Sequence, residues 1–368
     1  MRIGIITYHW VPNFGANLQS LATISMLRKF GHEPYIINYR PKSLVEKYEK
    51  TVSREQLLEH EKFLEEYLPQ TELCQNLEEV SLINKKYNFE TLISGSDAVL
   101  RLNYKTERDD LMFPNPFWLT FANNNQNKIF FSVSNMGTSF SKLDKNIKAE
   151  ITKTLKNSKI FVRDKWTEKQ IKLLDKEIKI EQLSDPMFLI EKYFKIPEKY
   201  NREKKEKYII LNLYKHLKNK KWVEQLNKII ELNNYKLISL PNPEDNSIKK
   251  VENNVNLPLH PLEWYSLIKN SSGYIGVRFH PIVASILNNV PFVSFDTYND
   301  KIISLDNLKS KTYDLCKKTK KTKFCKNKLK QKIISPRKTF QLLTKNHDNN
   351  HNYIEKEIDK IETIFKNL

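Results

Sequence analysis

Short apolar runs alternate with longer amphipathic stretches from the amino terminus onward. Residues 3–7 form a short apolar run, residues 18–27 carry apolar side chains at helical spacing, and residues 34–39 are apolar again. Gly31 stands where the helix should end, because glycine tolerates the left-handed backbone of a C-terminal cap. A strand, a helix and a strand in this order predict a βαβ unit with parallel strands.

The same alternation continues along the chain. Residues 43–88 are charged and mostly helical in pattern, and 101–127 form an irregular excursion. Thr167 and Gln170 predict a capping box that opens a helix, and Pro281 is expected at the first position of another. Further strands are predicted at 91–94, 128–133, 159–162, 208–213, 235–240, 274–277 and 291–295, and helices at 219–233, 261–270, 281–288 and 353–365.

Residues 191–207 are charged and have no apolar period, so they are predicted to link two α/β halves. A length of 368 residues fits two domains. We expect a first Rossmann-like domain at 1–190, a second at 208–340 and a terminal helical segment at 341–368. Two doubly wound domains facing a cleft are the simplest architecture, and ligands in such folds bind outside the carboxyl ends of the strands.

Composition narrows the class of protein. No run approaches the roughly 20 apolar residues of a membrane helix, and the apolar start is too short for a signal peptide. Three cysteines, Cys74, Cys316 and Cys325, make no disulfide framework, which is typical of a reducing cytoplasm. They also form no cluster with metal-ligand spacing, so no metal is expected. Only seven glycines are present, and most stand at predicted strand–helix junctions.

Basic residues outnumber acidic ones by 62 to 43, giving a formal net charge of +19. Many lysines concentrate in a basic segment at 309–332, for which a solvated, disordered face is one interpretation. Attraction to anionic lipid is a second, since each lysine near such a surface contributes about 1 kcal/mol. Nucleic acid is not expected as a partner, because no nucleic-acid-binding motif accompanies the charge.

The junction at 276–281 has the most informative chemistry. A predicted strand stops, Arg278 and His280 follow, and a helix begins. A helix N-terminus and an arginine both suit phosphate or carboxylate, and histidine can exchange a proton near neutral pH. Phe279 alternates away from them and is expected in the core. A surface arginine beside a capped core histidine is an equally open interpretation.

The junction at 7–19 joins the first strand to its helix with a single glycine. It lacks the glycines of a dinucleotide fingerprint and the Walker lysine, which argues against NAD and P-loop ATP chemistry. The polar residues His9, Asn13, Asn17 and Gln19 are suited to sugar hydroxyls. Ordinary capping and turn chemistry is the alternative interpretation.

Several short motifs stand in order along the chain. Each motif alone is weak, whereas the ordered set is fairly specific. The motifs are Asn-Phe-Gly-Ala-Asn-Leu-Gln at 13–19, Gly-Ser-Asp at 95–97, Val-Arg-Asp at 162–164, Ser-Asp-Pro at 184–186, Arg-Phe-His at 278–280 and Pro-Phe at 291–292. In this order and at this spacing, they make the chain resemble the polysaccharide pyruvyl transferase family over residues 1 to about 305.

The resemblance implies a fold like that of two-domain (GT-B-like) nucleotide-sugar glycosyltransferases, with a C-terminal helix that returns to the first domain. It implies transfer of a pyruvyl group from phosphoenolpyruvate to a sugar of a bacterial cell-surface polysaccharide or its precursor, such as capsule or exopolysaccharide, usually as a ketal. Arg278 and His280 match the family's Arg-x-His site, and Arg163 its earlier arginine. The first domain is the expected acceptor side, with substrate-binding residues His9, Asn13, Gly15, Asn17, Gln19, Ser96 and Asp97.

The chemistry fits these residue types. Phosphoenolpyruvate carries a phosphate and a carboxylate, so cations must hold it, and arginines would favour departure of the phosphate. Protonation of its methylene carbon and attack by a sugar hydroxyl require an acid and a base. His280 can supply one, and Asp97 or a second histidine the other. No cofactor beyond this donor substrate is expected.

One departure and two alternatives accompany this prediction. Family members usually follow Gly-Ser-Asp with glutamine, a hydrophobic residue and tryptophan, whereas Ala98, Val99 and Leu100 stand here. The alternatives are a GT-B-type glycosyltransferase that uses a nucleotide sugar and a non-catalytic sugar-binding relative. We expect a cytoplasmic protein, with peripheral contact at the inner face of the plasma membrane if the acceptor is lipid-linked. The sequence does not specify an oligomeric state.

Overall fold

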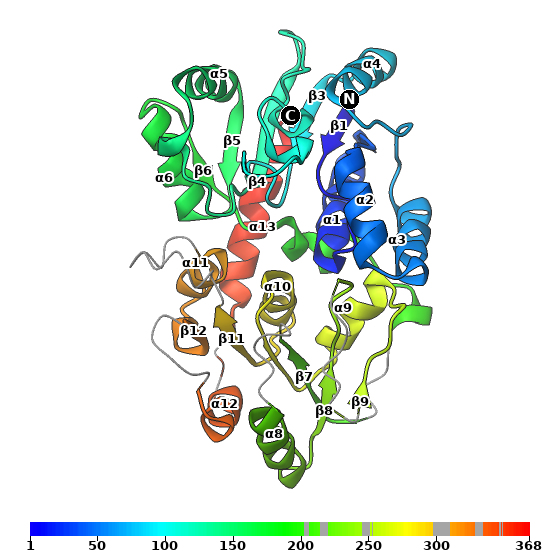
Figure 1. The fold of residues 1–368 in the computed structure, drawn as a ribbon, viewed down its shortest axis with the longest axis vertical. Helices are drawn as coiled ribbons and strands as arrows, with labels where there is room; N and C mark the ends of the chain where they lie inside the picture. Colours follow the sequence, from blue (N-terminus) through cyan, green and yellow to red (C-terminus); the bar gives the residue numbers. More distant parts are fainter. Residues whose placement is uncertain are drawn as a thin grey trace.

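A computed structural model shows two parallel sheets of six strands each, in halves that lie one above the other along the longest axis (Figure 1). The structure describes residues 1–201, 206–213, 220–244, 251, 253–296, 310–327, 334–345, 347 and 349–368. The expectation of an α/β protein with two Rossmann-like halves is confirmed.

The first half contains the elements up to residue 182. Its strands are β1 (Arg2–Ile6), β2 (Glu33–Ile36), β3 (Thr91–Ser94), β4 (Asn127–Val133), β5 (Lys159–Val162) and β6 (Glu181–Gln182). Its helices are α1 (Phe14–Lys29), α2 (Lys42–Thr51), α3 (Arg54–Tyr67), α4 (Leu77–Tyr87), α5 (Lys145–Lys156) and α6 (Lys165–Leu174), with 3₁₀ turns η1 (Asp109–Leu111), η2 (Pro116–Trp118) and η3 (Phe140–Lys142).

The remaining elements lie after residue 182. The strands are β7 (Tyr208–Asn212), β8 (Lys236–Ser239), β9 (Asn253–Asn254), β10 (Gly273–Gly276), β11 (Phe292–Asp296) and β12 (Cys325–Asn327). The helices are α7 (Ile190–Tyr193), α8 (Lys220–Leu232), α9 (Pro261–Lys269), α10 (Phe279–Leu287), α11 (Lys311–Lys318), α12 (Pro336–Leu343) and α13 (His351–Lys366), with 3₁₀ turns η4 (Pro186–Leu189), η5 (Glu198–Tyr200) and η8 (Thr322–Phe324).

The strand order of each sheet reverses at one point. The first sheet has the order β2-β1-β3-β4-β5-β6, so the reversal lies between β1 and β3. The second has the order β12-β11-β10-β7-β8-β9, which is the Rossmann order, with the reversal between β7 and β10. Ligands of doubly wound sheets bind outside the carboxyl ends of the strands at these points. Residues 7–15 and 95–97 follow β1 and β3, and residues 277–280 follow β10.

Burial explains why the strands read as continuous apolar runs. All residues of β3, β7 and β10 are buried, as expected for parallel strands covered on both faces. Helix α1 is also buried on most sides, because it packs against η4, α7 and α9 as well as against its own sheet. Gly31 follows this helix at φ +79°, which confirms its predicted role in the C-terminal cap.

The C-terminal helix α13 lies against the first half of the chain (Figure 1). The ring centroids of Phe131 in β4 and Phe365 lie 4.6 Å apart, and the Ser184 backbone N–H donates to Glu357 Oε2 at 3.0 Å. The buried side chains Ile354, Ile358, Ile361 and Phe365 keep the predicted helical spacing. The helix therefore returns to the first half, as the family resemblance implies.

Three local predictions need correction. Helix α6 begins at Lys165 and is capped by Asp164, whose carboxylate accepts from the Thr167 N–H, so Thr167 does not open the helix. Helix α10 begins at Phe279, which places Pro281 two positions further in than predicted. Strands β6, β9 and β12 are absent from the prediction because two or three paired residues leave no periodic signal.

The basic segment at 309–332 is not uniformly disordered. Residues 311–318 form α11, 322–324 form η8 and 325–327 form β12. Residues 309 and 328–332 lie outside the described residues, as do residue 219 of the predicted helix and 202–205 of the predicted linker. Helix α7 and η5 lie on the way from the first sheet to the second. The predicted domain boundaries stay a prediction.

Candidate active site

The amino ends of α1 and α10 meet where the two halves adjoin. Gly15 lies in the first turn of α1, and His280 is the second residue of α10. A Cβ atom built on Gly15 would lie 2.0 Å from His280 Cγ. Real Cβ atoms do not approach another atom so closely, so only glycine allows this contact. His280 is 5% exposed and is thereby held between the halves.

A buried ion network stands beside this contact. Arg163 directly follows β5 and is 4% exposed. Its Nη1 donates to Asp185 Oδ2 at 2.6 Å, and its Nη2 donates to Asp97 Oδ1 at 3.1 Å. One guanidinium therefore compensates two buried carboxylates that arrive from the ends of β3 and β6. These residues lie far apart in the sequence, so motif analysis did not reveal the network.

Backbone geometry fixes both carboxylates. Asp97 has φ +76°, a left-handed conformation that aspartate tolerates better than most residues. Its carbonyl accepts from the Ser134 N–H at 2.9 Å. Asp185 caps η4, because its Oδ1 accepts from the Met187 N–H at 3.0 Å. Both acids are thus held by the fold as well as by Arg163.

The acids are ionised despite their burial. Burial alone would raise the pKa of Asp97, but the charges of Lys311 and Arg163 hold it well below its usual range. Burial likewise opposes ionisation of Asp185, and the neighbouring His280 and Arg163 outweigh it and lower the pKa to about 2. The two acids and Arg163 therefore form a charged network inside the protein.

His280 faces this network. Its Nε2 lies 3.6 Å from Asp185 Oδ2, too far for a normal hydrogen bond, and has no hydrogen-bond partner among the described residues. Phe279 is buried as expected, and two cationic groups lie over its ring. Arg163 Cζ lies 4.7 Å and Lys311 Nζ 5.0 Å from the ring centroid. Lys311 is a site residue that sequence analysis missed, because it stands within a lysine-rich stretch that looks uniformly solvated.

Arg278 occupies the N-cap position of α10 and is half-buried. Burial raises the pKa of the Tyr48 phenol in α2, and the charges of Glu244 and Asp110 add to this rise, whereas those of Arg108 and Arg278 oppose it.

 Tyr48 belongs to the first half of the chain, and the charge of Arg278 acts on it across the junction between the halves. Arg278 therefore faces the first half of the chain.

A second polar cluster lies in the first half of the chain, close to Tyr48. The Tyr8 hydroxyl donates to Asp110 Oδ2 at 2.8 Å, and Arg108 donates to both oxygens of the same carboxylate at 3.0 and 2.6 Å. Sequence analysis missed Arg108 and Asp110 because they lie in the irregular excursion at 101–127, where no periodic pattern singles them out.

Most of the predicted substrate-binding residues have partners within the chain. Gln19 Nε2 donates to Thr7 Oγ1 at 3.1 Å, and the Ser96 N–H donates to Gln19 Oε1 at 3.1 Å. These hydrogen bonds join α1 to the loops after β1 and β3. Gln19 and Ser96 are fully buried, so they support the loops that form the site. Their predicted contact with substrate stays a prediction.

The other predicted residues of the first junction are also engaged. Asn17 Nδ2 donates to the His9 carbonyl at 2.6 Å, and Asn17 Oδ1 lies 2.9 Å from His60 Nδ1. His9 is fully buried, and burial together with the charge of Arg40 lowers its pKa to about 4. Asn13 caps α1 by accepting from the Gly15 N–H at 3.2 Å. The capping and turn interpretation thus describes the hydrogen bonds present, and binding of sugar hydroxyls stays a prediction.

The residues after Gly-Ser-Asp are apolar and buried. Val99 and Leu100 are fully buried and belong to the same hydrophobic cluster as Leu92 of β3 and Phe130 of β4, and Ala98 is 9% exposed. Positions that family members usually fill with glutamine and tryptophan therefore contribute to packing in this chain.

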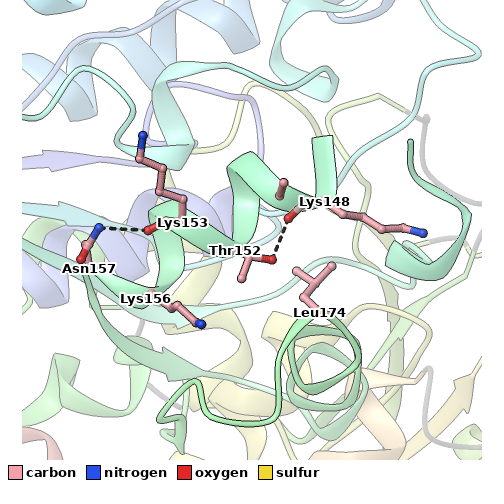
Figure 2. Close-up of a pocket in the computed structure, with 7 residues that line it drawn as sticks. Lys148, Thr152, Lys153, Lys156, Asn157 and Leu174 are labelled. Atoms are coloured by element: carbon pink, nitrogen blue, oxygen red, sulfur yellow. Dashed lines mark hydrogen bonds between the residues drawn. The ribbon is translucent and has the colours of Figure 1, made fainter. Parts of the chain in front are cut away.

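A separate surface pocket of about 550 Å³ lies between α5 and α6 (Figure 2). Its lining includes Lys148, Lys153, Lys156 and Leu174. Leu174 ends α6, whereas Arg163 precedes the start of this helix, so the pocket lies at the far end of α6 from the ion network. Nothing in its lining connects it to the predicted site residues.

The described part of the chain contains neither a candidate metal site nor a candidate membrane span. No group of three or more histidine, cysteine, aspartate or glutamate side chains in the described chain is placed to hold a metal ion. None of the described helices is both long and apolar enough to cross a membrane. The three cysteines are buried, and none of them forms a disulfide.

Solved structures with the same architecture are GT-B glycosyltransferases and epimerases. The UDP-GlcNAc 2-epimerase from Methanocaldococcus jannaschii has a TM-score of 0.55 at 14% identity, covering 99% of this chain and 100% of that one. The UDP-GlcNAc 2-epimerase from Neisseria meningitidis, bound to UDP-GlcNAc, has a TM-score of 0.53 at 10% identity, covering 100% of both. The spinosyn forosaminyltransferase SpnP has a TM-score of 0.52 at 11% identity, covering 99% of both.

These likenesses define the class of fold, which is GT-B-like. The family model of the polysaccharide pyruvyl transferases matches residues 13–299, and the chain belongs to this family. The family assignment predicted from the ordered motifs is confirmed. No curated protein matches the sequence.

Proposed function

We propose that the protein transfers a pyruvyl group from phosphoenolpyruvate to two hydroxyls of a sugar in a cell-surface polysaccharide or its precursor. A proton adds to the methylene carbon of the donor, and one sugar oxygen bonds to the neighbouring carbon. The bond from that carbon to the phosphate oxygen breaks, and the second sugar oxygen takes its place. Of the two hydroxyl protons, one replaces the proton used at carbon and the other leaves with phosphate. The products are a pyruvate ketal and inorganic phosphate.

The observation that carries this proposal is the position of the family's Arg-x-His motif. Arg278 and His280 stand at the strand reversal of the second sheet, and His280 touches Gly15 at the junction with the first half. A group in this position can reach a donor held by one half and an acceptor held by the other. Family membership supports this class of reaction.

The geometry supports separate roles for the three predicted catalytic residues. His280 moves the proton, because its Nε2 has no hydrogen-bond partner among the described residues and faces Asp185. Arg278 binds an anionic group of the donor. Arg163 already donates to two carboxylates, so it acts by holding Asp97 and Asp185 in place. Asp97 is held ionised and is the candidate base for the sugar hydroxyl.

The remaining expectations belong to the same proposal. The donor is consumed as a substrate, and no further cofactor takes part. The acceptor is a sugar or a lipid-linked oligosaccharide, which the protein meets in the cytoplasm or at the inner face of the plasma membrane. The exposed lysines of α11 and the turn after it support contact with anionic lipid.

Release of inorganic phosphate from phosphoenolpyruvate, measured against a panel of sugar acceptors, tests the proposal. We expect phosphate release that depends on the acceptor, with a matching gain of pyruvate on the sugar. Release of a nucleotide from a nucleotide sugar, without consumption of phosphoenolpyruvate, would instead indicate a glycosyltransferase. Binding of sugar without either reaction would indicate a non-catalytic relative.

A further inference from the structure

Lys311 is the first residue of α11 and reaches across to the first half of the chain. Its Nζ lies 3.9 Å from Asp97 Oδ1 and 5.0 Å from the centroid of the Phe279 ring. Its side chain is 23% exposed, so solvent or a ligand can reach it. Lys318 anchors the other end of this helix by donating to the Arg163 carbonyl at 3.0 Å. Lys311 therefore has a fixed position at the ion network.

The hydrogen-bonding capacity of Lys311 is unused. An ammonium group has three donors, yet Nζ makes no hydrogen bond to any group that the structure describes, and its one close carboxylate lies at 3.9 Å. Two neighbouring nitrogen atoms likewise make no hydrogen bond to the described residues. Arg163 Nε and His280 Nε2 are buried without a hydrogen-bond partner in the described part of the chain. Lys311, Arg163 and His280 therefore each carry a nitrogen atom without a hydrogen-bond partner among the described residues. All three side chains lie around the Phe279 ring.

A counterion role alone does not explain this arrangement. An ammonium that served only Asp97 would stand at about 2.7–2.9 Å, the usual length of a charge-assisted hydrogen bond. Asp97 already accepts from Arg163 Nη2 at 3.1 Å. Lys311 stands further off, partly exposed and over a ring that attracts cations without using their donors. This is the position of a cation that receives a second anion.

We propose that Lys311 binds an anionic group of the donor substrate directly, beside His280. The inference rests on the proposed function for the identity of the anion, phosphoenolpyruvate. It does not rest on that function for the presence of an anion, because the unused donors and the position over Phe279 are properties of this chain.

The protonation state of Lys311 should make the binding of phosphoenolpyruvate depend on pH. Burial and the charge of Arg163 lower the pKa of Lys311 to about 8, although Asp97 and the other acids oppose this. Below this pH the ammonium is charged and binds an anion, and above it the charge is lost. A phosphomonoester is fully ionised above its second pKa of about 6, so weakening above pH 8 would come from the protein. The charged and titratable groups that face Lys311 are Asp97, Asp164, Asp185, Arg163 and His280.

Calorimetric titration of the full chain with phosphoenolpyruvate tests the inference. Lys311→Met should raise Kd roughly ten- to a hundredfold, the effect of losing a charge-assisted contact. Lys317→Met, an exposed residue of the same helix, is the matched control and should leave Kd unchanged. Lys311→Met with the parent's Kd, and a lowered melting temperature, would show a counterion only and overturn the inference.

Lys311→Arg gives a second readout that does not depend on the stability of Lys311→Met. Arginine stays charged at all these pH values. We expect the parent to lose affinity for phosphoenolpyruvate between pH 8 and 9.5, while Lys311→Arg holds its affinity over the same range. Parallel curves for the two proteins would overturn the inference.

The same titrations with UDP separate this inference from the proposed function. If the parent binds UDP and not phosphoenolpyruvate, the proposed function fails, and a weaker UDP affinity of Lys311→Met still supports anion binding by Lys311. If the parent consumes phosphoenolpyruvate and Lys311→Met binds it normally, only the inference fails. A parent that binds neither anion overturns both.

Discussion

Gly15 and His280 touch across the two halves of the chain, and a Cβ atom on Gly15 would lie 2.0 Å from Cγ and 2.3 Å from Cβ of the histidine. The contact joins the first turn of α1 to the first turn of α10. It makes the position of the proposed proton-transfer group depend on how the two halves pack.

Gly15→Ala should therefore displace His280. Overpacking of this kind typically costs about 1–3 kcal/mol, and we expect lower stability together with a loss of turnover. Because the built Cβ also lies 2.3 Å from His280 Cβ, His280→Ala should not restore the stability of Gly15→Ala. Denaturant unfolding of the two single variants and the double variant measures this. Full stability of Gly15→Ala would contradict the close contact.

His280→Ala should lower turnover by roughly 10²–10⁴-fold, the usual range for loss of a general acid or base, while largely keeping the affinity for phosphoenolpyruvate. His351→Ala is the control, because His351 is exposed on α13 and pairs with Glu355 one turn away. Steady-state kinetics and calorimetry give both quantities, after melting curves show that each variant is folded. Near-normal turnover of His280→Ala would remove its proton-transfer role.

Arg278→Ala should weaken binding of phosphoenolpyruvate as well as turnover, because it removes a charge-assisted contact of about 1.5–3 kcal/mol. Arg278→Lys should rescue binding only in part, since a point charge does not reproduce the planar fork of the guanidinium. Kd measured for both variants decides this. Equal affinities of Arg278→Ala and the parent would place the donor elsewhere.

The elements with a strong apolar pattern could be predicted from sequence, and the network that connects them could not. The strand before Arg278 and the helix ended by Gly31 both follow from local pattern. Arg163, Asp97 and Asp185 come from three different strand ends, and a single sequence does not state that these ends meet. The ordered family motifs indicated that the residues matter, but not that Arg163 holds two acids.

Lysine-rich sequence hid two different kinds of residue. Lys311 and Lys318 contact the ion network, whereas Lys317 and Lys320 are exposed on the same helix and the turn after it. The sequence gives all of them the same apparent role, because charge alone does not say which face of a short helix is covered. Packing of α11 against the residues that follow β5 partly covers Lys311 and Lys318 and leaves Lys317 and Lys320 exposed.

The exposed lysines Lys317, Lys320 and Lys323 should give salt-sensitive attachment to anionic vesicles. At about 1 kcal/mol for each charge, changing all three to glutamine should weaken binding roughly a hundredfold, and added salt should weaken the parent in the same direction. Vesicle flotation measures both. Lys148, Lys153 and Lys156 of α5 (Figure 2) changed to glutamine provide the control with equal charge loss. Equal flotation of the two triple variants would rule out a specific role for the first set.

Arg163→Met should destabilise the protein by about 3–5 kcal/mol, because it leaves two buried carboxylates without their counterion. Arg163→Lys should recover only part of this, since one ammonium does not reach both acids in the geometry of the fork. Lys199→Met, which breaks an exposed ion pair with Glu66, is the control and should change little. Urea unfolding at neutral pH compares the three variants with the parent.

The same network should make stability fall in acid. Asp185 has a folded pKa of about 2, below the value of about 3.9 for an unfolded aspartate. The folded state therefore binds this proton less readily, and the stabilisation is fully present above pH 4 and lost as pH falls from about 4 to about 2. For Asp185 alone the loss is on the order of 2 kcal/mol. Asp185→Asn should flatten the pH dependence of unfolding in this window, whereas Asp359→Asn, on the exposed face of α13, should leave it unchanged. An unaltered pH dependence in Asp185→Asn would show that other carboxylates govern the acid transition.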